Sequence, residues 1–162
     1  MSYHLTKNEL DKLSNYVIRK LSEVDFEVPE ETAREVVITA SQIVPELKKI
    51  IDSVGKTGLY VRGEGAQPVR IIHAAGMQYK PDAAIEFYNQ SIIAFEVKLI
   101  RSGDPSGSFS KAIGQALTYL ALGNYQTVFV LLFDTRKRSP LRKESLVAQV
   151  EKLVPNLKIF VW

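Results

Sequence analysis

The sequence contains no cysteine and only two histidines, His4 and His73. Disulfide bonds, thiolate zinc sites and cysteine nucleophiles are therefore excluded, and a metal site built from several histidines is not expected. No apolar run approaches the roughly 20 residues that a membrane-spanning helix needs, and the first ten residues contain no apolar signal-peptide core. For 162 residues, 46% of them hydrophobic, we expect a single soluble, cytoplasmic domain over 1–162 with no membrane partner.

Residue periodicity predicts an α/β fold with a mixed central sheet and helices on its faces. Helical spacing of apolar residues predicts four helices, at about 7–22, 33–54, 109–122 and 140–153. Alternating or continuous apolar segments predict six strands, at 59–62, 69–74, 82–88, 91–100, 127–133 and 157–162. Pro45 is expected to kink or split the second helix, and Gly55 is expected to end it. Strands followed by alternating helices and strands are typical of a layered α/β domain.

The strands at 82–88 and 91–100 form the most informative pair. A turn at Asn89-Gln90 joins them as a hairpin, and each strand has one apolar face that must pack on the core. Because cross-strand partners share a face, the two partner numbers must sum to an even value, about 178 to 180. Asp82 then lies opposite Glu96 or Lys98, on the same face as both. Glu86 shares this face but lies roughly 13 Å farther along the strand, so we do not expect it to be a ligand.

Two carboxylates held this close repel each other, and the pKa of one rises unless a cation lies between them. Mg²⁺ or Mn²⁺ is the natural cation for a site made of oxygen atoms, and substrate phosphate oxygens complete its coordination. Lys98 beside such a site could orient or deprotonate an attacking water, or stabilise the phosphorane. A plain cross-strand salt bridge, in which Lys98 neutralises one acid, is the alternative.

The tripeptide Glu-x-Lys carries no information by itself. It occurs twice, at Glu96-Val97-Lys98 and at Glu46-Leu47-Lys48, and the second copy lies in a predicted helix with no aspartate placed to meet it. The first copy differs from this internal control through the hairpin that places Asp82 beside it.

Pro81-Asp82, followed after thirteen residues by Glu96-Val97-Lys98 and then by a helix bearing Gln115, resembles the PD-(D/E)xK nuclease superfamily. The resemblance covers roughly residues 30–134. It implies a restriction endonuclease-like αβββαβ core, here with extra N-terminal helices, and a Mg²⁺- or Mn²⁺-dependent deoxyribonuclease. The resemblance also implies that Asp82, Glu96 and the backbone carbonyl of Val97 bind the metal, and that Lys98 is the catalytic ammonium.

The predicted helix at 109–122 adds to the resemblance. Gln115 and Tyr119 resemble the Gln-x-x-x-Tyr motif of the RecB-like exonuclease branch, which implies a catalytic role for Gln115 and a nucleic-acid contact for Tyr119. Lys111, Gln115 and Tyr119 lie one turn apart on a stripe that flanks the apolar one, so the stripe is expected to reach the site or the DNA. Ordinary helix surface is the alternative.

Members of the superfamily usually add an acidic residue from the helix before the sheet. Glu30 is our first candidate, because it lies one turn before Ala33 at the edge of the apolar stripe. Glu31 and Glu35 project away from that stripe and rank lower. Two further candidates, Glu64 and His73, lie near strand ends that should face Asp82. For each of these residues, a surface position without function is the alternative.

Positive charge gathers in the second half of the chain. The net charge is +3, and residues 82–162 hold ten Lys/Arg against seven Asp/Glu. A cluster with no acid lies at 136–143: Arg136, Lys137, Arg138, Arg142 and Lys143. If the strand at 127–133 runs parallel to the Glu96 strand, Arg136, Lys137 and Arg138 rim the same sheet edge as Lys98 and bind nucleic-acid phosphates. A solvated loop is the alternative. Arg101 and Asp104 are expected either to contact a nucleic-acid backbone or to lie in a mobile connector.

Three hypotheses follow from these patterns. The first is a metal-dependent nuclease that hydrolyses phosphodiester bonds in DNA, acting as a monomer or a homodimer. The second is a nuclease-fold protein that binds nucleic acid or serves a structural role without turnover. The third is an unrelated α/β interaction protein in which Asp82, Glu96 and Lys98 form a salt bridge.

Overall fold

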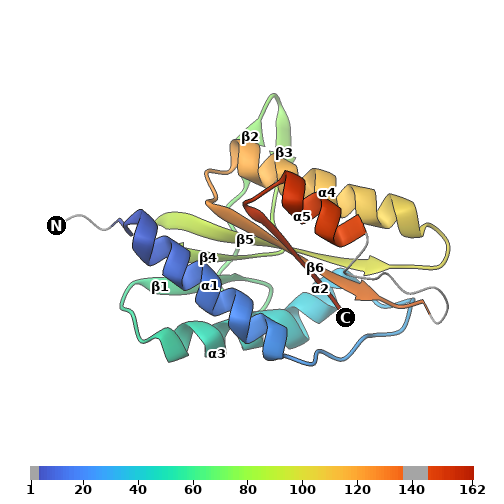
Figure 1. Cartoon of the computed structure of the whole chain (residues 1–162), viewed down its shortest axis with the longest axis horizontal. Helices are drawn as coiled ribbons and strands as arrows, with labels where there is room; N and C mark the ends of the chain where they lie inside the picture. Colours follow the sequence, from blue (N-terminus) through green and yellow to red (C-terminus); the bar gives the residue numbers. More distant parts are fainter. Residues whose placement is uncertain (1–3, 137–145) are drawn as a thin grey trace.

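The structure is a computed structural model that describes residues 4–136 and 146–162. Its centre is a five-stranded sheet with the strand order β1-β4-β5-β6-β7 (Figure 1). The strands are β1 (Leu59–Gly63), β4 (Ala83–Phe87), β5 (Gln90–Ile100), β6 (Thr127–Asp134) and β7 (Leu157–Val161). β1, β4 and β5 are antiparallel, whereas β5, β6 and β7 run parallel. The predicted mixed α/β sheet flanked by helices is confirmed.

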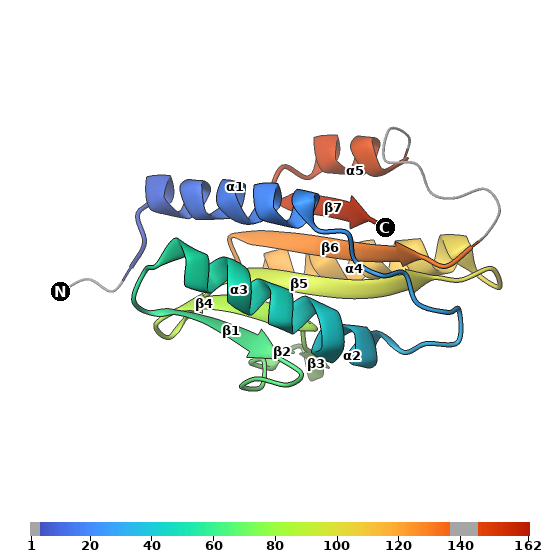
Figure 2. The ribbon, with the colours of Figure 1, turned by 90° about the horizontal axis from the view of Figure 1, so that it is seen from below.

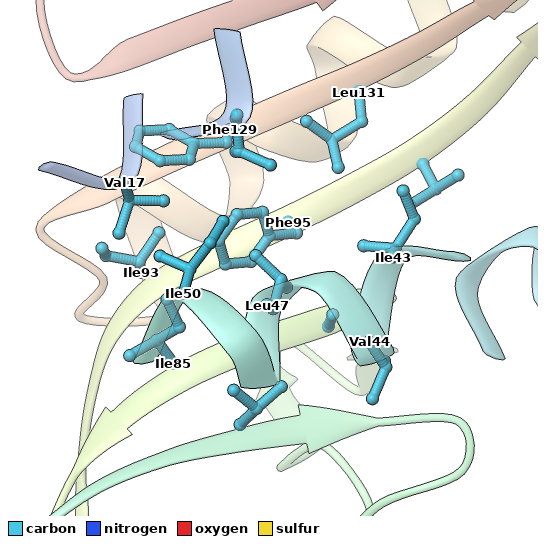
Figure 3. Close-up of a cluster of buried hydrophobic side chains, with 14 of the residues drawn as sticks. Val17, Ile43, Val44, Leu47, Ile50, Ile85, Ile93, Phe95, Phe129 and Leu131 are labelled. Carbon is cyan, nitrogen blue, oxygen red and sulfur yellow. The ribbon is translucent and has the colours of Figure 1, made fainter. Parts of the chain in front are cut away.

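Helices cover both faces of this sheet. Figure 2 shows α1 (Lys7–Glu23) and α3 (Val44–Val54) on one face and α4 (Pro105–Leu122) on the other. The core under α1 and α3 is built from apolar side chains of these helices and of the sheet, including Val17, Leu47, Phe95 and Phe129 (Figure 3). No helix in the described part of the chain is both long and apolar enough to cross a membrane.

Four small residues lie where α4 packs on the sheet. Ala84 and Ala94 from the sheet and Ala112 and Ala116 from α4 are completely buried. Alanine lets a helix approach a sheet closely, and the contact excludes water from that face. β5 is therefore buried on both sides, and a charged residue at its centre lies in a poorly hydrated environment.

The predicted break in the second helix is a π-helical turn. The segment consists of α2 (Glu35–Ile38), the π-helix η1 (Thr39–Ile43) and α3, with Pro45 in the first turn of α3. Proline has no N–H to donate and its ring clashes with the carbonyl four residues earlier, so a wider turn before it relieves the conflict. Gly55 ends α3 with φ of 69°, as predicted. The helix begins at Glu35 rather than near Ala33.

Two sequence predictions need correction. The strand predicted at 69–74 is shorter, and β2 (Ile72–Ala74) pairs with an unforeseen strand, β3 (Met77–Tyr79), in a separate two-stranded sheet. Helix α4 begins at Pro105 rather than Phe109, because the Asp104 side chain accepts a hydrogen bond from the Gly107 N–H at 3.0 Å and proline suits the first turn. The helix predicted at 140–153 is confirmed for its last part, α5 (Ala148–Leu153), and residues 140–145 lie outside the described residues.

The hairpin of β4 and β5 has the predicted even register where it matters for the site. Ala83 pairs with Phe95 and Ile85 with Ile93, so the partner numbers sum to 178. A β-bulge after Ile85 changes this parity toward the turn, where Phe87 pairs with Gln90. The turn accordingly consists of Tyr88 and Asn89, one residue earlier than predicted.

Candidate active site

Asp82 lies immediately before β4, across from Glu96 on β5. Its backbone N–H donates to the Phe95 carbonyl at 3.0 Å, and its Oδ2 accepts a hydrogen bond from the Val97 N–H at 2.7 Å. These two bonds fix both the backbone and the side chain of Asp82 against β5. The structure thus brings Asp82 and Glu96 together on one face of the sheet, as the hydrophobic pattern predicts.

Glu96 is held by a hydrogen bond from the helix α4. The residue is 5% exposed, and its Oε2 accepts a hydrogen bond at 2.8 Å from the hydroxyl of Tyr119 on α4. The same hydroxyl lies 3.1 Å from the carbonyl oxygen of Lys80, two residues before Asp82. Each carboxylate therefore has one oxygen held by a protein donor. Apart from the partner carboxyl, Asp82 Oδ1 and Glu96 Oε1 have no protein donor within residues 4–136 and 146–162.

The two carboxyls are hard to ionise together. Burial and, to a smaller extent, the charge of Glu35 raise the pKa of Asp82 to about 6, against the opposing hydrogen bond from the Val97 N–H. Burial and, second to it, the neighbouring charge of Asp82 raise the pKa of Glu96 to about 8. Near neutral pH the pair therefore retains about one proton. A bound cation would remove the repulsion that keeps this proton in place.

Lys98 lies on the same face of β5 as Glu96 and is half-buried. Its positive charge lowers the pKa of both Asp82 and Glu96, which places the ammonium near the pair. In the described ranges, however, no ion pair joins Lys98 to either acid within 4.0 Å. The salt bridge that the sequence left as an alternative is therefore not formed.

The acids of the segment before the sheet lie differently from their predicted ranking. Glu30 is exposed and lies in the loop before α2. Glu35, ranked lower, is the first residue of α2, and its Oε1 accepts hydrogen bonds from the Leu99 N–H at 3.3 Å and from Arg101 at 3.1 Å. The ranking is wrong because α2 begins two residues later than predicted and its first residue meets the end of β5. Glu31 instead accepts a hydrogen bond from the Ser102 N–H at 2.5 Å.

Arg101, predicted to contact nucleic acid, is engaged within the protein. Its guanidinium donates to the carbonyls of Glu31 at 2.9 Å and Ala33 at 2.7 Å, in addition to the Glu35 carboxylate. These three bonds dock the loop before α2 onto the end of β5. Asp104 likewise has a structural role, as the N-cap of α4.

The three residues of the predicted stripe on α4, which are Lys111, Gln115 and Tyr119, differ in their exposure. Lys111 is exposed, whereas Tyr119 is 1% exposed and contacts Glu96. The predicted direct contact of Tyr119 with nucleic acid is therefore wrong, because the helix rotates this residue under the sheet. Gln115 is half-buried, and its Oε1 is buried with no hydrogen-bond partner among the residues that the structure describes.

The remaining predicted residues lie around the site or away from it. Glu64 lines a cavity that Asp82 also lines, whereas His73 lies on the separate β2–β3 hairpin. β5 and β6 are parallel, with Ile100 opposite Asp134, so the end of β6 lies at the same sheet edge as the end of β5. Arg136 follows there, but Asp134 binds its guanidinium with two hydrogen bonds of 2.9 Å, which raise the pKa of Arg136. The other four predicted cations, Lys137, Arg138, Arg142 and Lys143, lie outside the described residues.

The donor set at Asp82 and Glu96 fits Mg²⁺ or Mn²⁺. Both metals prefer hard oxygen ligands and commonly use one or two protein carboxylates, with water and substrate phosphate completing the coordination. Within the described part of the chain, no group of three or more Asp, Glu, His or Cys side chains is placed to hold a metal ion. The site therefore offers two carboxylates, with the Val97 carbonyl as a predicted third ligand.

Buried carboxylates elsewhere in the sheet are neutralised by arginine. Glu86 on β4 is completely buried, and it accepts hydrogen bonds from Arg62 Nε at 2.5 Å and from Arg70 Nε at 2.8 Å. The sequence excludes Glu86 as a ligand because of its distance along the strand, and the structure gives its carboxylate two cationic partners.

Comparison with known proteins supplies no family for this chain. No family model matches it, and no curated protein matches it. A solved structure described as "Crystal structure of SSO0001" is similar over 88% of this chain and 83% of that chain, with 16% sequence identity and a TM-score of 0.28. A likeness at this level carries no argument about fold or function.

Proposed function

We propose that this protein is a metal-dependent nuclease that hydrolyses phosphodiester bonds in DNA, with Mg²⁺ or Mn²⁺ held by Asp82 and Glu96. One observation carries the proposal. The carboxyls of Asp82, which is half-buried, and Glu96, which is buried, lie side by side, each with one oxygen held by a protein donor, and no arginine neutralises them within residues 4–136 and 146–162. Ligands held by donors of the surrounding protein are typical of metal sites.

The chain's own residues supply the rest of the chemistry. A bound divalent metal would polarise the scissile phosphate and acidify a water molecule. The Val97 N–H and the Tyr119 hydroxyl keep the carboxylates oriented, so no reorganisation is needed when substrate binds. Lys98, free of an ion pair with either acid, is available to orient the attacking water or to stabilise negative charge on the phosphorane.

The arrangement of elements supports the same proposal. Three antiparallel strands, β1, β4 and β5, are followed by α4 and by β6, which returns parallel to β5. This is the helix–strand order that the resemblance to the PD-(D/E)xK superfamily implies. DNA as the partner and the cytoplasm as the compartment belong to the proposal. Homodimer formation stays a prediction, which light scattering at micromolar concentration tests.

A second candidate is a nuclease-fold protein that binds nucleic acid without cleaving it. The observation in its favour is Glu35, the acid of the preceding helix nearest to the site. Its carboxylate is engaged by Arg101 and the Leu99 N–H rather than left open to a metal. Metal-dependent turnover separates the two candidates.

The deciding experiment incubates plasmid and branched DNA with the protein, with and without Mg²⁺ or Mn²⁺. We expect cleavage that depends on the metal and that Lys98→Ala abolishes. Lys48→Ala is the matched control, because Lys48 ends the other Glu-x-Lys tripeptide on an exposed helix position. Binding of DNA without cleavage under every metal condition would favour the second candidate. Equal cleavage by wild type and Lys98→Ala would exclude the proposed site as its source.

A further inference from the structure

A cavity of about 260 Å³ is lined in part by Asp82, one member of the carboxyl pair. Asp82 forms part of its wall, together with Lys80 and Pro81 from the segment that leads into β4. The opposite walls come from α2 and η1, through Val36 and Thr39, and from the loop that follows β1. A group in this cavity would therefore lie next to a phosphate bound at Asp82.

The walls of this cavity combine apolar surface with two opposite charges. Val36, Pro68 and Val69 supply aliphatic surface, while Glu64 and Lys80 supply a carboxylate and an ammonium. Aliphatic walls suit the faces of a planar base, and polar groups suit its hydrogen-bonding edge. The ammonium also suits a neighbouring phosphate. A nucleotide presents all three kinds of group.

The loop that closes the cavity is held in place. Gly63 has φ of +148°, and a Cβ there would lie 2.8 Å from Val44 Cγ2 and 3.1 Å from the Asp82 carbonyl oxygen, so only glycine permits this approach. Backbone hydrogen bonds join Gly63 to Gln67 at 2.9 Å and Ala66 to Gly63 at 3.0 Å. Arg62 donates to the Pro68 carbonyl at 3.3 Å. The cavity is therefore formed before any ligand arrives.

We propose that this cavity receives one unpaired nucleotide next to the scissile phosphate, so that the substrate is DNA with an unpaired nucleotide at the cleavage position. The inference rests on the proposed function. A nucleotide inside a continuous duplex is paired and stacked, so moving it into the cavity costs the free energy of breaking its base pair and its stacking. For an unpaired nucleotide this cost is smaller. Single strands, flaps and bulges are the substrates of this class, and an uninterrupted duplex is the disfavoured one.

The test compares three labelled DNA molecules of one sequence: a continuous duplex, the same duplex with a one-nucleotide bulge, and the single strand. Cleavage rates are measured with Mn²⁺, and binding is measured separately by fluorescence anisotropy in EDTA. We expect the wild type to cleave and bind the bulged and single-stranded molecules roughly tenfold better than the duplex. Val36→Phe narrows the cavity. In this variant the preference for bulged and single-stranded DNA over the duplex should fall from about tenfold to about threefold or less, in both cleavage and binding.

Val37→Phe is the matched control, because Val37 is the next residue on α2, is 57% exposed and does not line the cavity. It should retain the full preference. If the Val36→Phe variant unfolds without cooperativity, the Ala66→Leu variant is used in its place, because that substitution narrows the same cavity from the loop. Equal cleavage of all three DNA molecules by the wild type overturns this inference and leaves the nuclease proposal standing. A preference that survives in the narrowed variants also overturns it. Absence of cleavage on every substrate overturns the nuclease proposal, and the inference with it.

Discussion

The hairpin of β4 and β5 has buried or half-buried acidic residues at two places, and their surroundings differ in charge. Glu86 lies between the guanidinium groups of Arg62 and Arg70. Asp82 and Glu96 lie side by side near the other end of β4 with no arginine partner among the residues that the structure describes. A buried carboxylate with no function is neutralised by a paired cation or by protonation. Glu86 thus has permanent cationic partners, whereas Asp82 and Glu96 have no arginine partner among the described residues. The lack of an arginine at this pair suits the binding of an exchangeable cation.

The largest expected effect is on catalysis. Asp82→Asn and Glu96→Gln each remove a charge that the metal requires, so the initial rate of DNA cleavage should fall by at least about 10²-fold. Glu86→Gln, assayed at a temperature where it is folded, should cleave at close to the wild-type rate. If Glu86→Gln lost activity as severely as the other two variants, the two places would not differ in function.

For stability, the order of these variants should be the opposite of their order in catalysis. Glu86→Gln leaves two arginines without their buried partner and should lower the free energy of unfolding by about 2–4 kcal/mol. Glu96→Gln removes one of two crowded charges, so without metal its free energy of unfolding should equal or exceed that of the wild type. Urea unfolding at pH 8 in EDTA measures both values. A similar loss in both variants would contradict the contrast between a compensated and an uncompensated carboxylate.

The pH dependence of stability sharpens the same comparison. Folding raises the pKa of Asp82 to about 6 and that of Glu96 to about 8, so between their ordinary values near 4 and pH 8 the folded protein binds more protons than the unfolded chain. The free energy of unfolding without metal should therefore fall as pH rises through this window, by roughly 2 kcal/mol or more. Asp82→Asn should flatten the profile. A wild-type profile that rises between pH 5 and pH 8 would contradict the assignment.

A smaller effect is expected from the Tyr119 hydroxyl. Tyr119→Phe removes the donor to Glu96 Oε2 and should weaken Mn²⁺ binding, measured by calorimetry, by about tenfold. Tyr125→Phe is the control, because Tyr125 is also buried but has Ser91 rather than Glu96 as its hydrogen-bond partner. Equal Mn²⁺ affinity in both variants would limit Tyr119 to packing.

The sequence predicts the hairpin and the meeting of Asp82 with Glu96 because alternating apolar residues determine which residues share a face. It does not predict how close α4 comes to the sheet, which depends on four buried alanines from separate segments. The sequence therefore places Tyr119 on a stripe beside the apolar one, whereas in the structure Tyr119 lies in the core. The position of Glu35 is likewise set by long-range contacts of Arg101. The β-bulge after Ile85 leaves no periodic trace, because it shifts the register by one residue near the turn.

The most direct test of the central claim is thermal unfolding of the metal-free protein at pH 7.5 with increasing Mn²⁺. If Asp82 and Glu96 hold the metal, saturation near 100 times the dissociation constant should stabilise the wild type by about 2.7 kcal/mol, raising the melting temperature by about 5–10 °C. The Asp82→Asn/Glu96→Gln double variant should show no increase, and Glu86→Gln should show the full increase from its lower starting point. An unchanged wild-type melting temperature, or an equal increase in the double variant, would contradict a metal site at this pair.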